Sequence, residues 1–389
     1  MTEAPPSPQA VCTKAEAPSE DIRLFVVLFA LAALTRIALC WWVWTHLESR
    51  RIEIHQLAIS VAEGRGYGNP YVEPTGPTAH VAPGYPLLLA ALYSLFGTGR
   101  DGDLAELALG ALTMSVLYAL LPLVARALGF SERTGIVAAA IGIAVPYNFV
   151  LELRGGDASA AALCLASLAL ITARLWRSGR FTASAGARHG LVWGAGLLIA
   201  PALLPVEAAW LATAALRHGR QVLRYGSVLA FTTLAVLSPW AIRNAAVLGS
   251  PILFRSNLGL ELQVSHNDLA RPTMLENLRN GDFTKHHPFN SRAEAQRVRD
   301  LGEVAYNRGK LRQAVQWMMA NPVGTVRLTA LRILLFWFPL TDRPAQVALI
   351  WALTIVGIAG WVLALRNRIA GMPLLAAIWL TYPLMYYAV

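Results

Sequence analysis

The sequence is poor in charge: Asp, Glu, Lys and Arg together make up only 14% of its 389 residues, whereas hydrophobic residues make up 56%. The mean hydropathy is correspondingly high, at +0.47. A chain of this length cannot bury so much apolar surface in one soluble core, and ordinary soluble domains are about one-quarter charged. The composition therefore excludes a soluble protein and predicts one whose solvent is partly lipid.

Cysteines and metal-ligand patterns are scarce too. The chain has three cysteines, Cys12, Cys40 and Cys164. They form no C-x-x-C pair and show no disulfide spacing, so they indicate no redox compartment. His266, His286 and His287 lack the spacing of metal ligands, and we expect them to be solvated or hydrogen-bonded. No metal site is predicted, and dependence on a divalent metal is left open.

The N-terminal region lacks the features of a signal peptide. Residues 1–21 are rich in Pro, Ser, Ala and Glu and predict a disordered tail. The apolar run that follows, Leu24 to Trp44, is too long for a signal-peptide core, and no small-residue cleavage site comes after it. The run is therefore predicted to remain as a membrane anchor.

Apolar runs close to the roughly 20 residues that cross hydrocarbon recur along the chain. The predicted spans are 22–46, 104–127, 134–151, 157–175, 190–203, 204–217, 224–241, 345–365 and 372–388. Two further runs, 83–97 and 323–340, are predicted to lie in the membrane interface, because the first is too short and the second carries Arg327 and Arg332. The expected fold is an all-α polytopic membrane protein of about nine spans. Its expected parts are the tail (1–21), a membrane region (22–241) with a first external loop (47–103), a long external loop containing helices (242–344) and C-terminal spans (345–389).

The arginines predict the orientation of these spans. If the two interfacial runs do not cross, the basic short loops all fall on one side, which should be cytoplasmic. The arginines of these loops are Arg126, Arg133, Arg174, Arg177, Arg180, Arg188, Arg217, Arg220, Arg224, Arg366 and Arg368. The chain is then a multi-pass plasma (inner) membrane protein with a cytoplasmic N-terminus, and residues 47–103, the loop near Asp157 and residues 243–342 are external. The basic residues behind the net charge of +10 are expected to set the topology and to contact anionic lipid headgroups. Membrane lipid is therefore an expected partner and nucleic acid is not.

Two acidic residues are candidates for chemistry on the external face. Glu53 lies where the chain leaves the first span, and a carboxylate at the membrane surface can accept a proton from a hydroxyl. The alternative is a solvated glutamate at a helix start. Asp157 follows Arg154-Gly-Gly at the next external turn, where ordinary helix N-capping would also explain it. Both acids are expected on the same face of the membrane.

Three arginines are candidates for binding a phosphate. Arg243 and Arg255 are expected at headgroup depth, where a guanidinium can hold a phosphate, although Arg243 could instead be an interfacial anchor beside Trp240. Arg36 lies inside the first span, where it could reach an anionic headgroup or a pyrophosphate-like donor. Its alternative is snorkelling towards the Trp41–Trp44 belt. Residues 291–319 have the apolar periodicity of one scaffold helix, and Glu207 is expected to be structural.

Three stretches of sequence carry a resemblance. The first is E-x-x-x-L-A-x-x-x-x-x-G-x-G-Y from Glu53 to Tyr67, continuing to T-G-P-T-A-H-x-A-P-G-Y-P-L-L-L-A and the L-F-G that ends at Gly97. The second is S-P-W-x-x-R-N with S-N-x-G-L-E-L, from Ser238 to Leu262. The third is H-P, G-E-x-x-Y, N-P and R-x-x-x-F-W, from His287 to Trp337. In this order they resemble the GT-C membrane glycosyltransferases, which include glycosyltransferase family 39 (protein O-mannosyltransferases), aminoarabinose transferases and bacterial Rgt-type enzymes. The resemblance covers nearly the whole chain after residue 22.

The resemblance implies a GT-C fold and transfer of one sugar, with inversion, from a polyprenyl-phosphate-linked donor to a lipid, glycan or protein hydroxyl. Family members carry an acid, most often Asp, in the first external loop and a second acid in the next. Glu53 and Asp157 stand at these positions, the Glu being a departure that still supplies a carboxylate. The residues assigned to substrate binding are Arg243, Arg36, Arg255, His55, His80, Tyr85 and Glu261. Family members end with further spans, so the resemblance also implies that this chain is truncated.

Two other functions are compatible with the membrane pattern. A transporter or lipid-carrier flippase also needs many spans and charges within the membrane, but the sequence shows no internal repeat and that function leaves the long external loop unexplained. A catalytically inactive relative of the transferases would keep the fold and lose the chemistry, and Glu53 is the residue that decides between the two.

Overall fold

The computed structural model describes residues 18–46, 51–145, 149–154 and 156–389. Regular structure in these ranges is helical, and the β-pairing within them is a single bridge between Gly68 and Pro77. The helices are α1 (Pro18–His46), α2 (Glu53–Ala62), α3 (Gly84–Phe96), α4 (Arg100–Leu128), α5 (Glu132–Ala144), α6 (Phe149–Arg154), α7 (Ala158–Ser178), α8 (Ala183–Ile199), η1 (Pro201–Leu203), α9 (Leu204–His218), α10 (Gln221–Leu248), α11 (Leu258–Ser265), α12 (Met274–Arg279), α13 (Asp282–His286), α14 (Arg292–Leu301), α15 (Glu303–Ala320), α16 (Pro322–Trp337), α17 (Pro344–Arg366), α18 (Met372–Thr381) and α19 (Leu384–Ala388).

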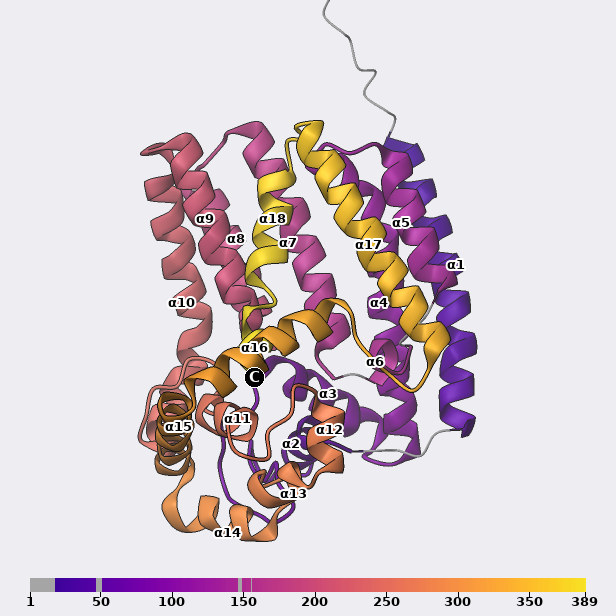
Figure 1. Ribbon diagram of the computed structural model, residues 1–389. Helices are drawn as coiled ribbons and strands as arrows, with labels where there is room; N and C mark the ends of the chain where they lie inside the picture. Colours follow the sequence, from indigo (N-terminus) through magenta and orange to yellow (C-terminus); the bar gives the residue numbers. More distant parts are fainter. Residues whose placement is uncertain (1–17, 47–50, 146–148, 155) are drawn as a thin grey trace, which may run out of the picture.

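The helices form a bundle in which α1, α4, α7, α10 and α17 are each long and apolar enough to cross a membrane. The prediction of an all-helical fold with several helices able to cross a membrane is therefore confirmed for the described residues. The shorter helices α5, α8, α9 and α18 run alongside the long ones (Figure 1). The count of nine spans stays a prediction, because these four have fewer residues than a straight crossing of hydrocarbon needs.

Several predicted boundaries differ from those observed. The predicted span 134–151 includes a helix that ends at Ala144, after which residues 146–148 lie outside the described residues. The span predicted at 190–203 begins earlier, at Ala183, and gives way to a 3-10 turn that starts at Pro201. The last predicted span is divided at Pro383, whose ring removes a backbone donor that a continuous helix would use.

The predicted N-terminal tail falls mostly outside the described residues, which begin at residue 18. The last four residues of that tail are helical, because α1 begins at Pro18. Proline fits the first turn of a helix, and the acidic Glu20 and Asp21 there complement the positive end of the helix dipole.

Glycines bring two helices of the bundle close together. A Cβ atom placed on Gly186 or Gly190 of α8 would lie 2.5 Å from a backbone oxygen of α10. The adjoining core contains the buried Trp193, Leu197 and Leu229. Packing of this closeness needs residues without side chains, as is common between helices in membranes.

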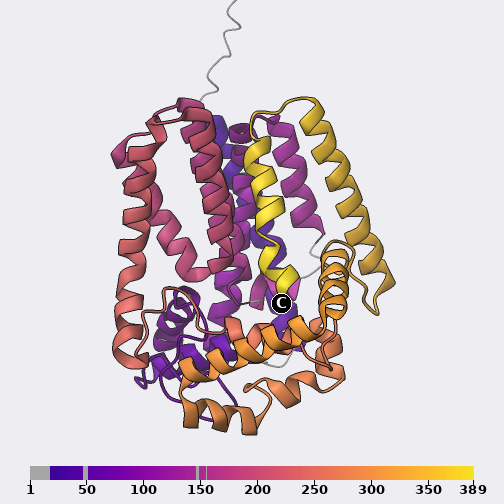
Figure 2. The same ribbon diagram turned by 60° about the vertical axis from the view of Figure 1, so that its left-hand side comes forward.

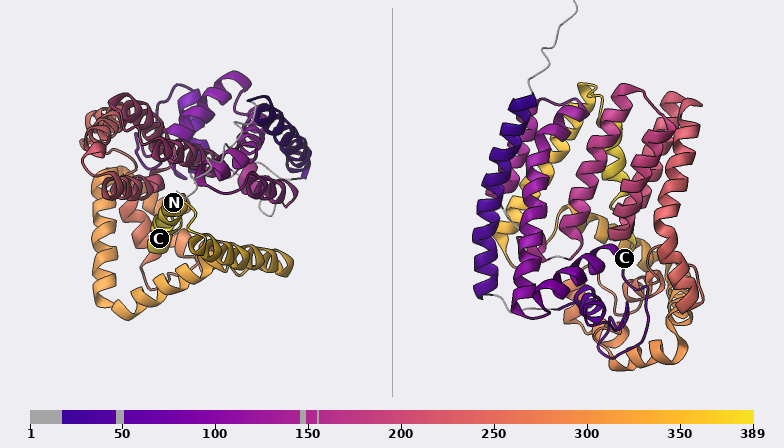
Figure 3. Two further views of the ribbon diagram at one scale, coloured as in Figure 1. Left: turned by 90° about the horizontal axis from the view of Figure 1, so that it is seen from above. Right: turned by 180° about the vertical axis from the view of Figure 1, so that it is seen from behind.

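One end of the bundle carries a cap, which we define as residues 51–97 and 249–343. The cap contains α2, α3 and the helices from α11 to α16, all gathered beneath the same ends of the long helices (Figures 1 and 3). Helix α16 lies across the bundle instead of along it (Figure 1), and Figure 2 shows α15 running crosswise below the long helices. This arrangement agrees with the prediction that residues 83–97 and 323–340 do not cross.

The segment predicted as one helix at 291–319 is two helices. Helix α14 ends at Leu301 and α15 begins at Glu303, because Gly302 between them has φ +78°, a backbone conformation that glycine adopts readily. The break turns the chain so that Glu303 faces the first loop of the cap, where it accepts hydrogen bonds.

The end of the bundle opposite the cap gathers the arginines that sequence assigned to one side. Arg177 there donates a hydrogen bond to the Arg126 carbonyl at 2.9 Å, and the Gly371 N–H donates to the Leu128 carbonyl at 2.8 Å. Loops distant in sequence therefore meet at this end. That it faces the cytoplasm stays a prediction.

Cysteine labelling in intact cells tests that orientation. In a background with Cys12, Cys40 and Cys164 replaced, an impermeant maleimide should label Asp300→Cys, an exposed site on the cap. It should label Ser178→Cys, exposed at the opposite end, only after permeabilisation. Labelling of Ser178→Cys alone in intact cells would show that the cap is cytoplasmic.

Candidate active site

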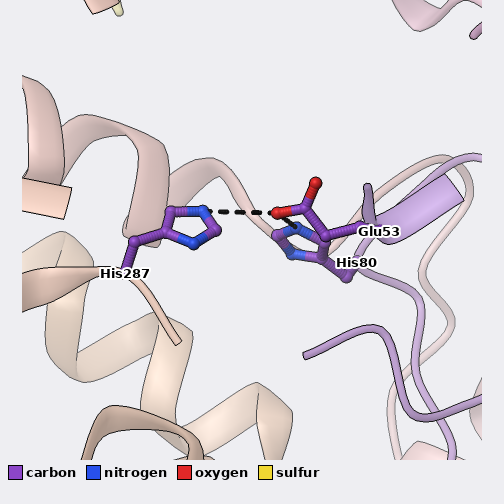
Figure 4. Close-up of side chains that lie close together, drawn as sticks. All are labelled: Glu53, His80 and His287. Atoms are coloured by element: carbon purple, nitrogen blue, oxygen red, sulfur yellow. Dashed lines mark ion pairs between the residues drawn. The ribbon is translucent and has the colours of Figure 1, made fainter. Parts of the chain in front are cut away.

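Glu53 begins α2 at the cap end of the bundle and meets two histidines from separate parts of the chain (Figure 4). His80 comes from the loop before α3, and His287 follows α13 in the cap. The Glu53 Oε1 atom lies 3.8 Å from the Nε2 atom of each imidazole. The carboxylate is 22% exposed, whereas the two rings are buried. We call Glu53, His80 and His287 the carboxylate–histidine cluster.

Hydrogen bonds on the far sides of the rings indicate their tautomers. The Phe289 N–H donates to Nδ1 of His287 at 3.2 Å, so the proton of the neutral ring is on Nε2. The Tyr71 hydroxyl lies 2.9 Å from Nδ1 of His80 and has no other acceptor among the described residues, which makes it a donor there. Both rings therefore turn an Nε2–H towards Glu53.

The cluster brings three possible metal-ligand atoms within 4.8 Å of one another, which the sequence spacing did not reveal. Metal-bound histidines usually donate a hydrogen bond from their second nitrogen. His287 instead accepts one there, and its Nε2 carries a proton where a metal would need a lone pair. In these tautomers the arrangement fits a carboxylate that faces two N–H groups better than it fits a divalent ion.

The histidines set the charge of Glu53. Burial alone would raise the pKa of its carboxyl, but the nearby N–H and charge of His80, together with the charge of His287, outweigh burial and lower that pKa to about 2. Burial lowers the pKa of His287, although the charges of Glu53 and Glu261 oppose this effect. At neutral pH Glu53 is therefore an anion facing a neutral His287.

Glu303 holds the first loop against the rest of the cap. Its carboxylate accepts from the Ala79 N–H at 2.8 Å, from the Ser256 hydroxyl at 2.6 Å and from the Thr78 hydroxyl. The Thr78 hydroxyl also accepts from the His80 N–H at 2.9 Å. Glu303 thus fixes the backbone that carries His80, and sequence reasoning gave it no role.

Arg243 also holds this loop. Its guanidinium donates to the carbonyls of Thr78 at 2.6 Å and Tyr67 at 2.7 Å, and it lies over the Tyr67 and Trp240 rings. From sequence, the alternative for Arg243 was an interfacial anchor beside Trp240. The observed contacts fit a residue that ties α10 to the first loop, and they occupy donors that a phosphate would use.

Arg255 is an exposed arginine that bonds the backbone of the cluster. Its Nε donates to the His80 carbonyl at 3.2 Å, and its charge acts on Asp157. Its two terminal nitrogens have no hydrogen-bond partner among the described residues. These nitrogens are well placed to bind an anion that approaches the cluster.

Asp157 occupies the N-cap position of α7, but its side chain accepts no hydrogen bond from that helix. Ordinary side-chain capping therefore does not explain this residue. Burial raises the pKa of the Asp157 carboxyl, while the charge of Arg255 acts in the opposite direction. Arg255 thus bonds the His80 backbone and has a charge that also acts on Asp157.

The other predicted substrate-binding residues lie around the cluster rather than in it. His55 points away from it and bonds Glu106 of α4 at 3.0 Å, with both side chains buried. Glu261 accepts from the Asn257 amide at 2.7 Å and acts on His287 through its charge. Tyr85 is buried where the charges of Glu106 and Asp157 reach it.

Arg36 requires a correction. It neither snorkels nor reaches a headgroup, because its side chain is fully buried in the bundle and bonds Glu152 of α6 at 2.7 Å. It also donates to the carbonyls of Gly142 and Ile143 at 2.8 and 2.9 Å and to the Tyr118 hydroxyl at 3.1 Å. A guanidinium occupied in this way ties α1 to α4, α5 and α6 and has little left for a substrate.

His287 was expected to be solvated or hydrogen-bonded, and its Nδ1 does accept a hydrogen bond from the Phe289 N–H. Sequence reasoning missed that the buried ring is directed at Glu53 (Figure 4). The sequence feature that could have identified it is the H-P motif, which with G-E-x-x-Y forms part of the third stretch of the family resemblance. Spacing could not have paired it with Glu53, which lies in another part of the chain.

The site is thus an ionised carboxylate at the end of a membrane helix bundle, flanked by two imidazoles and an exposed arginine. Comparison with protein-family models, curated proteins and solved structures finds no match to this chain.

Proposed function

We propose that this chain is a membrane glycosyltransferase. It moves a single sugar from a polyprenyl-phosphate donor to an acceptor hydroxyl at the cap end of the bundle, which is the external face of the plasma membrane. The observation that carries the proposal is the carboxylate–histidine cluster, placed where the long helices end and therefore where a lipid-borne phosphate lies. The motif order supports the transferase class and the GT-C fold with about nine spans.

Glu53 is the proposed base. The acceptor oxygen attacks the anomeric carbon while the bond from that carbon to the phosphate oxygen breaks, and the lipid phosphate leaves with the electron pair. A carboxylate with a pKa near 2 is a weak base. It takes the hydroxyl proton only as the new bond forms and the hydroxyl becomes acidic. The His80 and His287 N–H groups keep the carboxylate ionised and oriented for this step.

Arg255 is the proposed partner of the leaving phosphate. The leaving group needs positive charge more than a proton, and Arg255 has terminal nitrogens that described residues do not occupy. Arg243 was also a phosphate-binding candidate from sequence, but its bonds to Thr78 and Tyr67 favour a positioning role. Asp157, beside Arg255, would orient that arginine or the acceptor.

Replacing Arg255 tests the leaving-group assignment. Arg255→Ala should lower transfer from a polyprenyl-phosphate sugar by about 100-fold, because a preorganised cation facing developing negative charge is lost. Arg255→Lys should recover part of the rate, since lysine restores the charge without the forked geometry. Arg312→Ala, another exposed cap arginine, is the control and should keep the wild-type rate. A wild-type rate in Arg255→Ala would remove Arg255 from the mechanism.

A transporter or flippase remains the principal alternative, and a panel of radiolabelled polyprenyl-phosphate sugars separates the two classes. A transferase releases the label from the lipid onto an acceptor, whereas a flippase moves the labelled lipid across the bilayer intact. Translocation of intact lipid without any transfer in reconstituted vesicles would reject the proposed function.

A further inference from the structure

An apolar groove lies between α1 and α4. The groove there has a volume of about 440 Å³, many times the roughly 30 Å³ share of one water molecule. It is lined by small side chains, including Ala33 and Ala108, and by larger apolar ones, including Phe29, Ile37 and Leu112. Its wall is almost entirely apolar, so lipid chains can fill it without unsatisfied polar groups.

The groove is long enough for a lipid tail. Its lining on α1 runs from Phe29 to Trp44, which corresponds to about 22 Å along a helix. This length exceeds half of the roughly 30 Å hydrocarbon core of a bilayer. Both walls are helices of membrane-spanning length, so the surrounding medium supplies acyl chains directly.

Positive charge and a free donor mark the cap end of the groove. Arg100, the first residue of α4, is exposed and places its guanidinium carbon 4.3 Å from the centre of the Trp44 ring. Trp44 lines the groove, and its buried indole N–H has no acceptor among the described residues. The exposed cation of Arg100 at headgroup depth complements a lipid phosphate, and the Trp44 ring holds it beside the groove.

The groove and the carboxylate–histidine cluster use different faces of α4. Leu104 and Ala108 face the groove, whereas Glu106 between them faces α2 and bonds His55. Residues two positions apart on a helix do not share a face. The occupant of the groove is therefore separate from a donor held at Glu53 and Arg255.

We propose that the groove between α1 and α4 holds one anionic glycerophospholipid, with an acyl chain along the groove and its phosphate against Arg100 and Trp44. A zwitterionic headgroup would bring its own cation towards Arg100 and bind less well. The bound lipid fills the space between the two helices and does not depend on the proposed transferase activity.

Native mass spectrometry of the purified full chain tests this proposal. After incubation with equal amounts of phosphatidylglycerol and phosphatidylcholine, the chain should retain one phosphatidylglycerol. Arg100→Gln should lower its affinity about fivefold, the effect of one basic residue at a lipid surface. Ala108→Phe should abolish retention by filling the groove. Arg312→Gln on the cap and Ala230→Phe, at an exposed position of α10, should retain the lipid as wild type does.

Three results would overturn the proposal. Equal retention of phosphatidylcholine would remove the role of charge, and unchanged retention in Ala108→Phe would place the lipid elsewhere. Displacement of phosphatidylglycerol by a polyprenyl phosphate in competition would instead assign the groove to the donor. Failure of any kind here leaves the transfer assays of Glu53 and Arg255 variants unaffected, so the two proposals are judged separately.

Discussion

Glu53→Gln should lower sugar transfer by about 100-fold or more, because the amide keeps the size of the side chain but cannot take the acceptor proton. The structure sharpens this expectation. The glutamine side chain has the size of the glutamate and can keep its contacts with the Nε2 atoms of His80 and His287, which lie 3.8 Å away, so the geometry of the cluster should survive. The loss should therefore appear in kcat rather than in folding. Sugar transfer is measured on purified protein beside its thermal unfolding.

A matched substitution controls for the loss of a charge from the same segment. Glu63 follows the last residue of α2, is exposed and pairs with Arg65, far from the histidines along the helix. Glu63→Gln should leave both transfer and unfolding at the wild-type level. Full activity in Glu53→Gln, with Glu63→Gln also active, would reject Glu53 as the base and limit the family resemblance to the fold.

The low pKa of Glu53 also sets the pH range in which its charge matters. An ordinary glutamate titrates near pH 4.3, and Glu53 titrates near 2 in the folded protein. Its ionised form therefore stabilises the fold above about pH 4.3, and that contribution is lost as the pH falls towards 2. For the same reason, a decline of activity between pH 5 and 7 cannot come from Glu53 in the free enzyme.

The sequence predicted the membrane helices well because their signal is local. Runs such as 104–127 and 345–365 contain in their own composition the information that makes them helices in lipid, and α4 and α17 match them closely. The grouping of the arginines is likewise a property of short loops. Helix breaks at Gly302 and Pro383 were missed because the apolar period continues across them.

The site was harder to predict from sequence, because its residues are distant along the chain. Glu53 and Asp157 were identified as candidates from their places after predicted spans. Their partners come from separate loops. His80 belongs to the first loop, which Glu303 and Arg243 hold in place, whereas His287 follows α13 and Arg255 precedes α11. No pattern in one sequence reports contacts across such separations. The motif order marked these positions without showing what each side chain contacts.

Arg36 illustrates the same limit and gives the prediction with the largest expected effect on stability. Arg36→Met should lower the free energy of unfolding by about 3–5 kcal/mol, because it leaves the Glu152 carboxylate without its partner in the bundle. Arg36→Met combined with Glu152→Met removes both charges and should recover much of that loss. The four proteins of this double-mutant cycle are compared by unfolding in detergent, with transfer measured per folded molecule. If Arg36 snorkelled, Arg36→Met would change stability little and would show no coupling to Glu152. If Arg36 bound substrate, the double variant would have lower transfer even where the fold is restored. Because the guanidinium is fully buried and bonded to three neighbouring helices, we expect strong coupling in stability and near-normal transfer per folded molecule.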